Sequence, residues 1–76
     1  MLELFYSFKQ RTLDAGEFFK FRKAIEKLID KDDAVIIKKE NETVSITFTI
    51  ENAFKEPSIL FYLGISVEEV RRRFDK

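Results

Sequence analysis

The sequence contains no cysteine and no histidine, and it has only one proline and two glycines among its 76 residues. Without cysteine, the chain cannot form a disulfide scaffold, a zinc ribbon or a thiol nucleophile. Without histidine, it has no imidazole to serve as a general base. An excess of one charge is also lacking, since 14 Lys and Arg balance 14 Asp and Glu. A neutral chain does not indicate nucleic acid as the default partner.

The sequence is rich in apolar side chains: 45% of the residues are hydrophobic, and nine are Phe. A chain of this length forms a single domain, here 1–76, and needs a dense core or one shared with a partner. The N-terminal residues lack the positive region and cleavage site of a signal peptide. The longest apolar run, Ile59 to Ile65, is far shorter than the ~20 residues that span a bilayer. We therefore expect a cytoplasmic protein without membrane contact.

Three segments are predicted as strands, and they cover residues 2–9, 34–39 and 43–50. The first and the last alternate with a period of two. In the last of them every second residue is apolar, and the residues between carry hydroxyl groups. A sheet face built of hydroxyls is normally solvated, so helices should cover the other face only. The turn at 39–42 predicts an antiparallel hairpin between the second and third strands.

Helical spacing appears twice. Asp14 and Glu17 have the form of a capping box, and the apolar stripe behind them predicts a helix that extends to Ile29. Asp30 and the acidic residues after it should end that helix in solvent. A second helical region begins after residue 52, with a break expected at Pro57. The predicted fold is α+β in the order β-α-β-β-α, a three-stranded sheet with the helices on one face. Such a sheet has two edges, which small proteins often close by pairing with a second copy.

The segment Leu63–Val70 resembles the helix-turn-helix pattern, in which a glycine turn joins a first helix to a capped recognition helix. In this interpretation residues 57–63 form the first helix, and the second runs from Ser66 to Phe74. The resemblance implies a small DNA-binding regulator that uses residues 57–74. Its candidate contacts would be Ser66 and the basic cluster Arg71, Arg72 and Arg73.

The three arginines also have a structural interpretation. Glu68 precedes Arg72 by four residues, and Glu69 precedes Arg73 by four. At this spacing the pairs would bridge along a solvated helix and would suit its C-terminal dipole. We favour this interpretation over phosphate binding.

The aromatic residues are too numerous for one face of so small a core. Five fall outside the predicted stripes: Phe5, Phe19, Phe54, Phe61 and Tyr62. Either the ends of helices and loops cover them, or they form an interface, where aromatic side chains concentrate. The interface candidates are Phe5, Phe19, Phe61 and Tyr62.

No hydroxyl has a recognisable activating base, and no carboxylate cluster has the spacing of a cation site. We therefore expect a binding or regulatory protein rather than an enzyme, with neither cofactor nor metal. Its expected partner is a second copy of itself or another protein, and DNA binding through 57–74 is the alternative.

Overall fold

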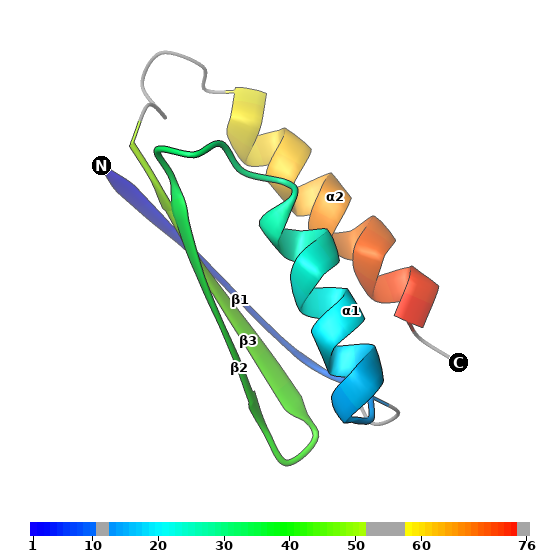
Figure 1. The fold of residues 1–76 in the computed structure, drawn as a ribbon. Helices are drawn as coiled ribbons and strands as arrows, with labels where there is room; N and C mark the ends of the chain where they lie inside the picture. Colours follow the sequence, from blue (N-terminus) through cyan, green and yellow to red (C-terminus); the bar gives the residue numbers. More distant parts are fainter. Residues whose placement is uncertain (11–12, 52–57, 75–76) are drawn as a thin grey trace.

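Three strands and two helices follow one another in the order β-α-β-β-α in the computed structural model (Figure 1). The structure describes residues 1–10, 13–51 and 58–74. The elements are β1 (Leu2–Lys9), α1 (Ala15–Glu26), β2 (Ala34–Glu40), β3 (Thr43–Ile50) and α2 (Ser58–Phe74). The predicted α+β class and the predicted order of elements are confirmed.

The third strand in the chain is the central strand of the sheet. β3 lies between β1 and β2 and is antiparallel to both. The edge strands β1 and β2 therefore run parallel to each other without touching. A two-residue turn joins β2 to β3, and Asn41 in that turn has a φ of 54°. Asn tolerates this left-handed conformation better than most residues, as tight hairpins require.

Both helices lie on the same side of the sheet (Figure 1). The alternating apolar residues of β3 point toward them and are buried, whereas the hydroxyl residues between are partly exposed. Burial of each large apolar side chain stabilises the fold by about 1.5–3 kcal/mol. The core consists of Leu13, Phe21, Ile25, Val44, Ile46, Phe48, Ile50, Leu63, Val67 and Val70.

α1 begins as the sequence predicts and ends earlier. The Asp14 carboxylate accepts a hydrogen bond from the Glu17 backbone N–H at 2.7 Å, so Asp14 is the N-cap. The helix ends at Glu26, with Lys27 as C-cap, rather than at Ile29. The acidic segment behind it does more than end a helix in solvent, because the Asp33 carboxylate accepts from the Glu51 N–H at 2.9 Å. That bond ties the loop before β2 to the end of β3.

α2 is one continuous helix, so the predicted turn at Gly64 and the helix start at Ser66 are wrong. Gly64 does not have positive φ, and Ser66 is only 7% exposed. The apolar stripe runs on through the glycine, with Leu63 before it and Val67 after it, both buried. A glycine inside a helix destabilises it by about 1 kcal/mol relative to alanine. Burial of the apolar stripe stabilises the helix in the fold by more than that. The break expected at Pro57 lies outside the described residues.

Across the described residues, neither helix combines the length and apolar character needed to cross a membrane.

Candidate interaction surfaces

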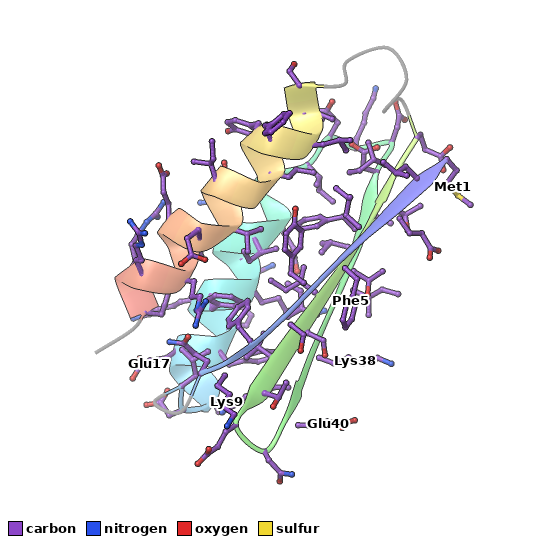
Figure 2. All side chains as sticks on the ribbon, turned by 180° about the vertical axis from the view of Figure 1, so that it is seen from behind. Met1, Phe5, Lys9, Glu17, Lys38 and Glu40 are labelled. Carbon is purple, nitrogen blue, oxygen red and sulfur yellow. The ribbon has the colours of Figure 1, made fainter. Side chains whose placement is uncertain are left out.

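The four aromatic residues predicted as interface candidates are all exposed in the structure. The exposed fractions are 67% for Phe5, 59% for Phe19, 79% for Phe61 and 58% for Tyr62. They do not form one surface, because Phe5 lies on the sheet face that the helices leave open (Figure 2) and the other three lie on the helices. No single flat contact can therefore cover all four. Phe54 lies outside the described residues.

An apolar row crosses the middle of the open sheet face. Phe5 of β1 and Ile36 of β2 both pair with Thr47 of β3, so the three residues stand side by side on neighbouring strands. Ile36 is 59% exposed. Figure 2 shows Phe5 and Lys38 projecting from the sheet on the side away from the helices. Phe5 and Ile36 are thus two large apolar side chains in water on the same face.

Polar rows flank this apolar row on both sides. One row beyond it contains Glu3, Thr49 and Ala34. In the other direction come Ser7, Ser45 and Lys38, and then Lys9, Thr43 and Glu40. Charged residues therefore occur only on the edge strands of this face, and the central strand contributes hydroxyl groups alone.

A second apolar surface lies on the first half of α2. Phe61, Tyr62 and Ile65 are all exposed, and their spacing of one, three and four residues places them on one side of the helix. This surface faces away from the core residue Leu63. It is separate from the open sheet face.

The three arginines at the end of α2 have three different environments. Arg71 lies over the ring of Phe8, with 4.8 Å from its guanidinium carbon to the ring centroid, and it is 3.7 Å from Glu68. Arg72 is 3.9 Å from Glu68, as the four-residue spacing predicts. The predicted pair between Glu69 and Arg73 is absent among the ion pairs of the described residues. Of the candidate DNA contacts, Ser66 is buried, whereas Arg72 and Arg73 are exposed.

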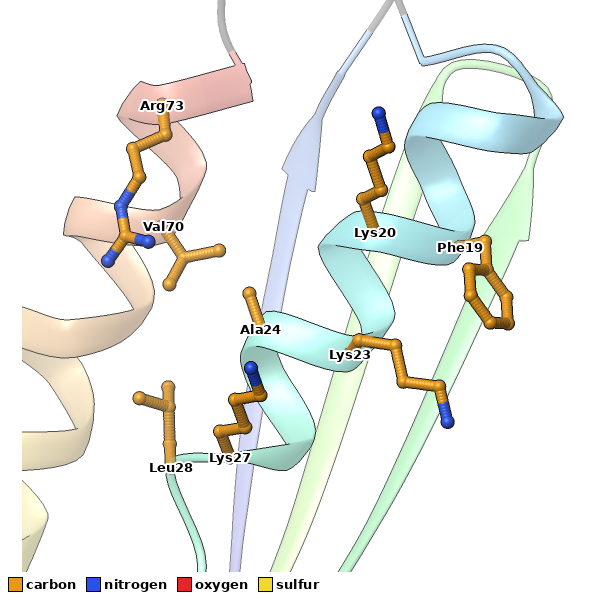
Figure 3. Close-up of a pocket in the computed structure, with 8 residues that line it drawn as sticks. All are labelled: Phe19, Lys20, Lys23, Ala24, Lys27, Leu28, Val70 and Arg73. Carbon is orange, nitrogen blue, oxygen red and sulfur yellow. The ribbon is translucent and has the colours of Figure 1, made fainter.

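Arg73 instead lines a groove formed by residues of both helices (Figure 3). The groove has a volume of about 360 Å³. Its lining consists of Phe19, Lys20, Lys23, Ala24, Lys27, Leu28, Val70 and Arg73. Four of these eight residues are cationic, and the lining includes no carboxylate.

Tyr6 is a titratable residue whose pKa is perturbed by its surroundings. Burial raises the pKa of the Tyr6 phenol above its usual value of 10.0. The ring lies edge-on to Phe48, with centroids 5.9 Å apart and an interplanar angle of 81°. Among the described residues no three His, Cys, Asp or Glu side chains are grouped so that they could hold a metal ion. The perturbed phenol belongs to the core and lies outside both exposed surfaces.

No family model, curated protein or solved structure matches the chain, so its function has to be inferred from the surfaces themselves.

Sequence reasoning missed several residues of these surfaces. Ile36 could have been found, because the period of two in β2 places it on the side of Lys38, and Phe5 already marked that face as unusual. Lys20 and Lys27 are seven residues apart and so share one side of α1. Arg73 of α2 lines the same groove only because of the way the two helices pack. The residue pattern within one helix cannot predict that packing.

Proposed function

We propose that this protein is a non-enzymatic binding protein that forms a homodimer through the open face of its sheet. The observation that carries the proposal is the apolar row made by Phe5 and Ile36 on either side of Thr47. Large exposed apolar side chains gathered on one face of a small protein mark a contact surface. An interface has such residues at its centre and polar residues at its rim.

A second copy fits this face by symmetry. A two-fold axis parallel to the strands lays β1 of each copy over β2 of the other and keeps the rows aligned. Phe5 then packs against Ile36 of the second copy, and this contact occurs twice. Two open sheets that pack face to face in this way form a sandwich of the common aligned type.

The charges of the flanking rows suit the same arrangement. Lys9 and Glu40 stand at opposite ends of one row, because both pair with Thr43. The two-fold axis therefore places Lys9 opposite Glu40 of the second copy. In the other rows Glu3 lies opposite Ala34, and Ser7 lies opposite Lys38. Like charges do not oppose each other in any row, so the surface is complementary to itself.

Two features support a binding role without catalysis. The sequence lacks the histidine and cysteine that most often act as general bases and nucleophiles. In the central row of the sheet face the side chains are apolar or hydroxylated, and charged residues occur only in the rows beside it, which suits packing against another surface. We therefore assign the protein no cofactor.

Solution mass by sedimentation equilibrium tests the proposal. The wild type should be a dimer whose mass changes little with added salt, because the contact is mainly apolar and exposed ion pairs contribute little. Phe5→Thr and Ile36→Thr keep good strand residues and should each raise the dissociation constant by about tenfold or more, as central interface residues do. The matched control is Phe61→Gln, which removes an equally exposed aromatic residue from α2.

A charge exchange tests the symmetry. Lys9→Glu alone brings like charges together at Glu40 of the second copy and should weaken the dimer. The double variant Lys9→Glu with Glu40→Lys should restore it. A wild type that stays monomeric at high concentration overturns the proposal, as does a dimer that ignores both threonine substitutions. Duplex DNA added to the same samples tests the alternative, which predicts a mass increase that salt abolishes.

A further inference from the structure

The groove between α1 and α2 concentrates positive charge that the protein itself leaves unpaired. Glu26, an acidic residue of α1, is bound to Arg22 at 3.1 Å and lies 3.9 Å from Lys23. Lys20, Lys27 and Arg73 make no ion pair within the described part of the chain. The whole sequence is neutral, so this is a local excess of charge and not a general property of the surface.

Helix dipoles account for only part of this arrangement. A cation in the last turn of a helix is stabilised by the dipole, which applies to Lys27 at the C-cap of α1 and to Arg73 near the end of α2. Lys20 lies in the middle of α1, where the dipole gives no such benefit. The two helices run in opposite directions (Figure 1), so their C-terminal ends do not meet. Cations from both helices nevertheless line one groove, where they repel each other unless an anion joins them.

The floor of the groove is apolar. It is lined between the cations by Ala24 of α1, by Leu28 just after the end of α1, and by Val70 of α2. In Figure 3 the side chain of Lys27 reaches into the space between the helices, and the side chain of Arg73 extends along α2 beside Val70. A ligand that satisfies the whole surface therefore has an apolar part for the floor and negative groups for the rim. A bare phosphate chain would leave the floor unused.

The aromatic residue at the rim does not favour nucleic acid. Bases bind single-strand binding proteins by stacking on open aromatic faces. Phe19 is already covered on one face by Lys23, whose Nζ lies 5.4 Å from the ring centroid. In Figure 3 both side chains point away from α2, at the outer edge of the groove. At about 360 Å³ the groove is at the lower end of small-ligand sites, and it suits side chains of a segment.

We infer that the groove between α1 and α2 binds an acidic peptide segment of a partner protein. One large apolar side chain of the segment packs on Ala24, Leu28 and Val70. Flanking Asp or Glu carboxylates accept hydrogen bonds from Lys20, Lys27 and Arg73. This site lies on the opposite side of the molecule from the open sheet face, so it is independent of the proposed dimer and remains accessible in it.

Selection from a displayed library of random peptides tests the inference and requires no assumption about which protein the partner is. The wild-type protein should select peptides in which Asp or Glu flanks a large apolar residue. The best peptide is then synthesised with a fluorescent label, and its dissociation constant is measured by anisotropy at two salt concentrations. Because charge-assisted hydrogen bonds carry part of the binding, added salt should weaken it.

Two neighbouring arginines provide a matched pair of variants. Arg73→Gln should weaken binding of the selected peptide by about tenfold or more, since it removes a charge-assisted hydrogen-bond donor. Arg72→Gln removes the same charge from the next position, where Arg72 is 78% exposed and lies outside the groove lining, and should change binding less than twofold. Lys27→Gln provides a second groove variant. Circular dichroism confirms that each variant is folded.

Three results would overturn the inference. If the selected peptides are not enriched in Asp or Glu, the cations of the groove do not determine its specificity. Equal effects of Arg72→Gln and Arg73→Gln would show general electrostatic attraction instead of binding in the groove. A single-stranded oligonucleotide that binds more tightly than the peptide, and is lost in Arg73→Gln, would assign the groove to nucleic acid. Peptide binding is also measured with the Phe5→Thr variant, which should weaken the dimer and leave the groove intact, so that the two proposals are tested separately.

Discussion

The side-chain amide of Gln10 donates a hydrogen bond to the backbone carbonyl of Phe74, 3.1 Å away. The last carbonyls of a helix have no partner within it, so Gln10, just after β1, caps the described end of α2. Gln10 is only 2% exposed, and its own N–H donates to the carbonyl of Glu42 at 2.7 Å. One buried polar residue thus joins the first strand, the hairpin turn and the last helix.

Gln10→Ala should lower the free energy of unfolding by about 1–3 kcal/mol, because it leaves a part-buried carbonyl without its donor. Urea denaturation followed by circular dichroism measures the loss. Glu3→Ala changes an exposed residue of the same strand and should stay within about 0.5 kcal/mol of the wild type. Equal effects of the two substitutions would mean that the cap does not contribute.

Gly64→Ala should stabilise the protein by about 0.5–1 kcal/mol, since alanine restricts the unfolded chain and suits a helix interior. A Cβ at this position meets nothing closer than the Tyr6 hydroxyl oxygen, at 3.7 Å, which is an ordinary contact. Thermal and urea denaturation show whether the substitution raises or lowers the free energy of unfolding. A turn with positive φ at Gly64 would make the same substitution destabilising, so this measurement separates one continuous helix from a helix-turn-helix.

Asp14→Ala should lower the free energy of unfolding by about 0.5–2 kcal/mol, the usual cost of losing an N-cap. Asp14→Asn retains a side-chain oxygen that accepts from the Glu17 N–H and should retain most of the stability. The two variants compared by urea denaturation isolate the hydrogen bond. If both lose the same amount, then the negative charge of Asp14 matters and the cap geometry does not.

The raised pKa of Tyr6 makes part of the stability depend on pH. Because the folded state favours the neutral phenol, this contribution is complete below the ordinary pKa of 10.0 and is lost as the pH rises from there through the folded-state pKa. Tyr6→Phe should remove this component of the alkaline loss. The free energy of unfolding measured by urea denaturation at several alkaline pH values checks this loss.

The sequence was sufficient to predict the strands and the whole of α1 except the position of its end. Period-two patterns are clear when one face is buried and the other solvated, as Val44 and Thr43 illustrate at the start of β3. The sequence analysis did not predict the order of the strands in the sheet, although the distribution of charged residues indicates it. The outward residues of β3 carry no charge, whereas Glu3, Lys9, Lys38 and Glu40 belong to the strands that became edges.

The continuity of α2 could not be judged from Gly64 and its neighbours. A glycine followed by Ser66 and Glu69 is a local signal for a turn and a helix start, and burial of Leu63 and Val67 on the same sheet overrides it. The interhelical groove was beyond prediction for a related reason. Which cations of α1 meet Arg73 depends on the crossing of two helices that the chain separates by a hairpin.

The central place of β3 has a consequence for the order in which the chain folds. β2 and β3 are joined by two residues, so their hairpin is local and closes quickly. β1 pairs with β3 in a register that joins Leu2 to Ile50. The long chain segment between the two strands loses conformational entropy before their contacts form, so this pairing is formed late. During synthesis β1 is made before β3, and the first pair of their ladder, Lys9 with Thr43, cannot form until Thr43 has followed. We therefore expect docking of β1 to limit the folding rate, and β1 to be the strand that two nascent copies exchange.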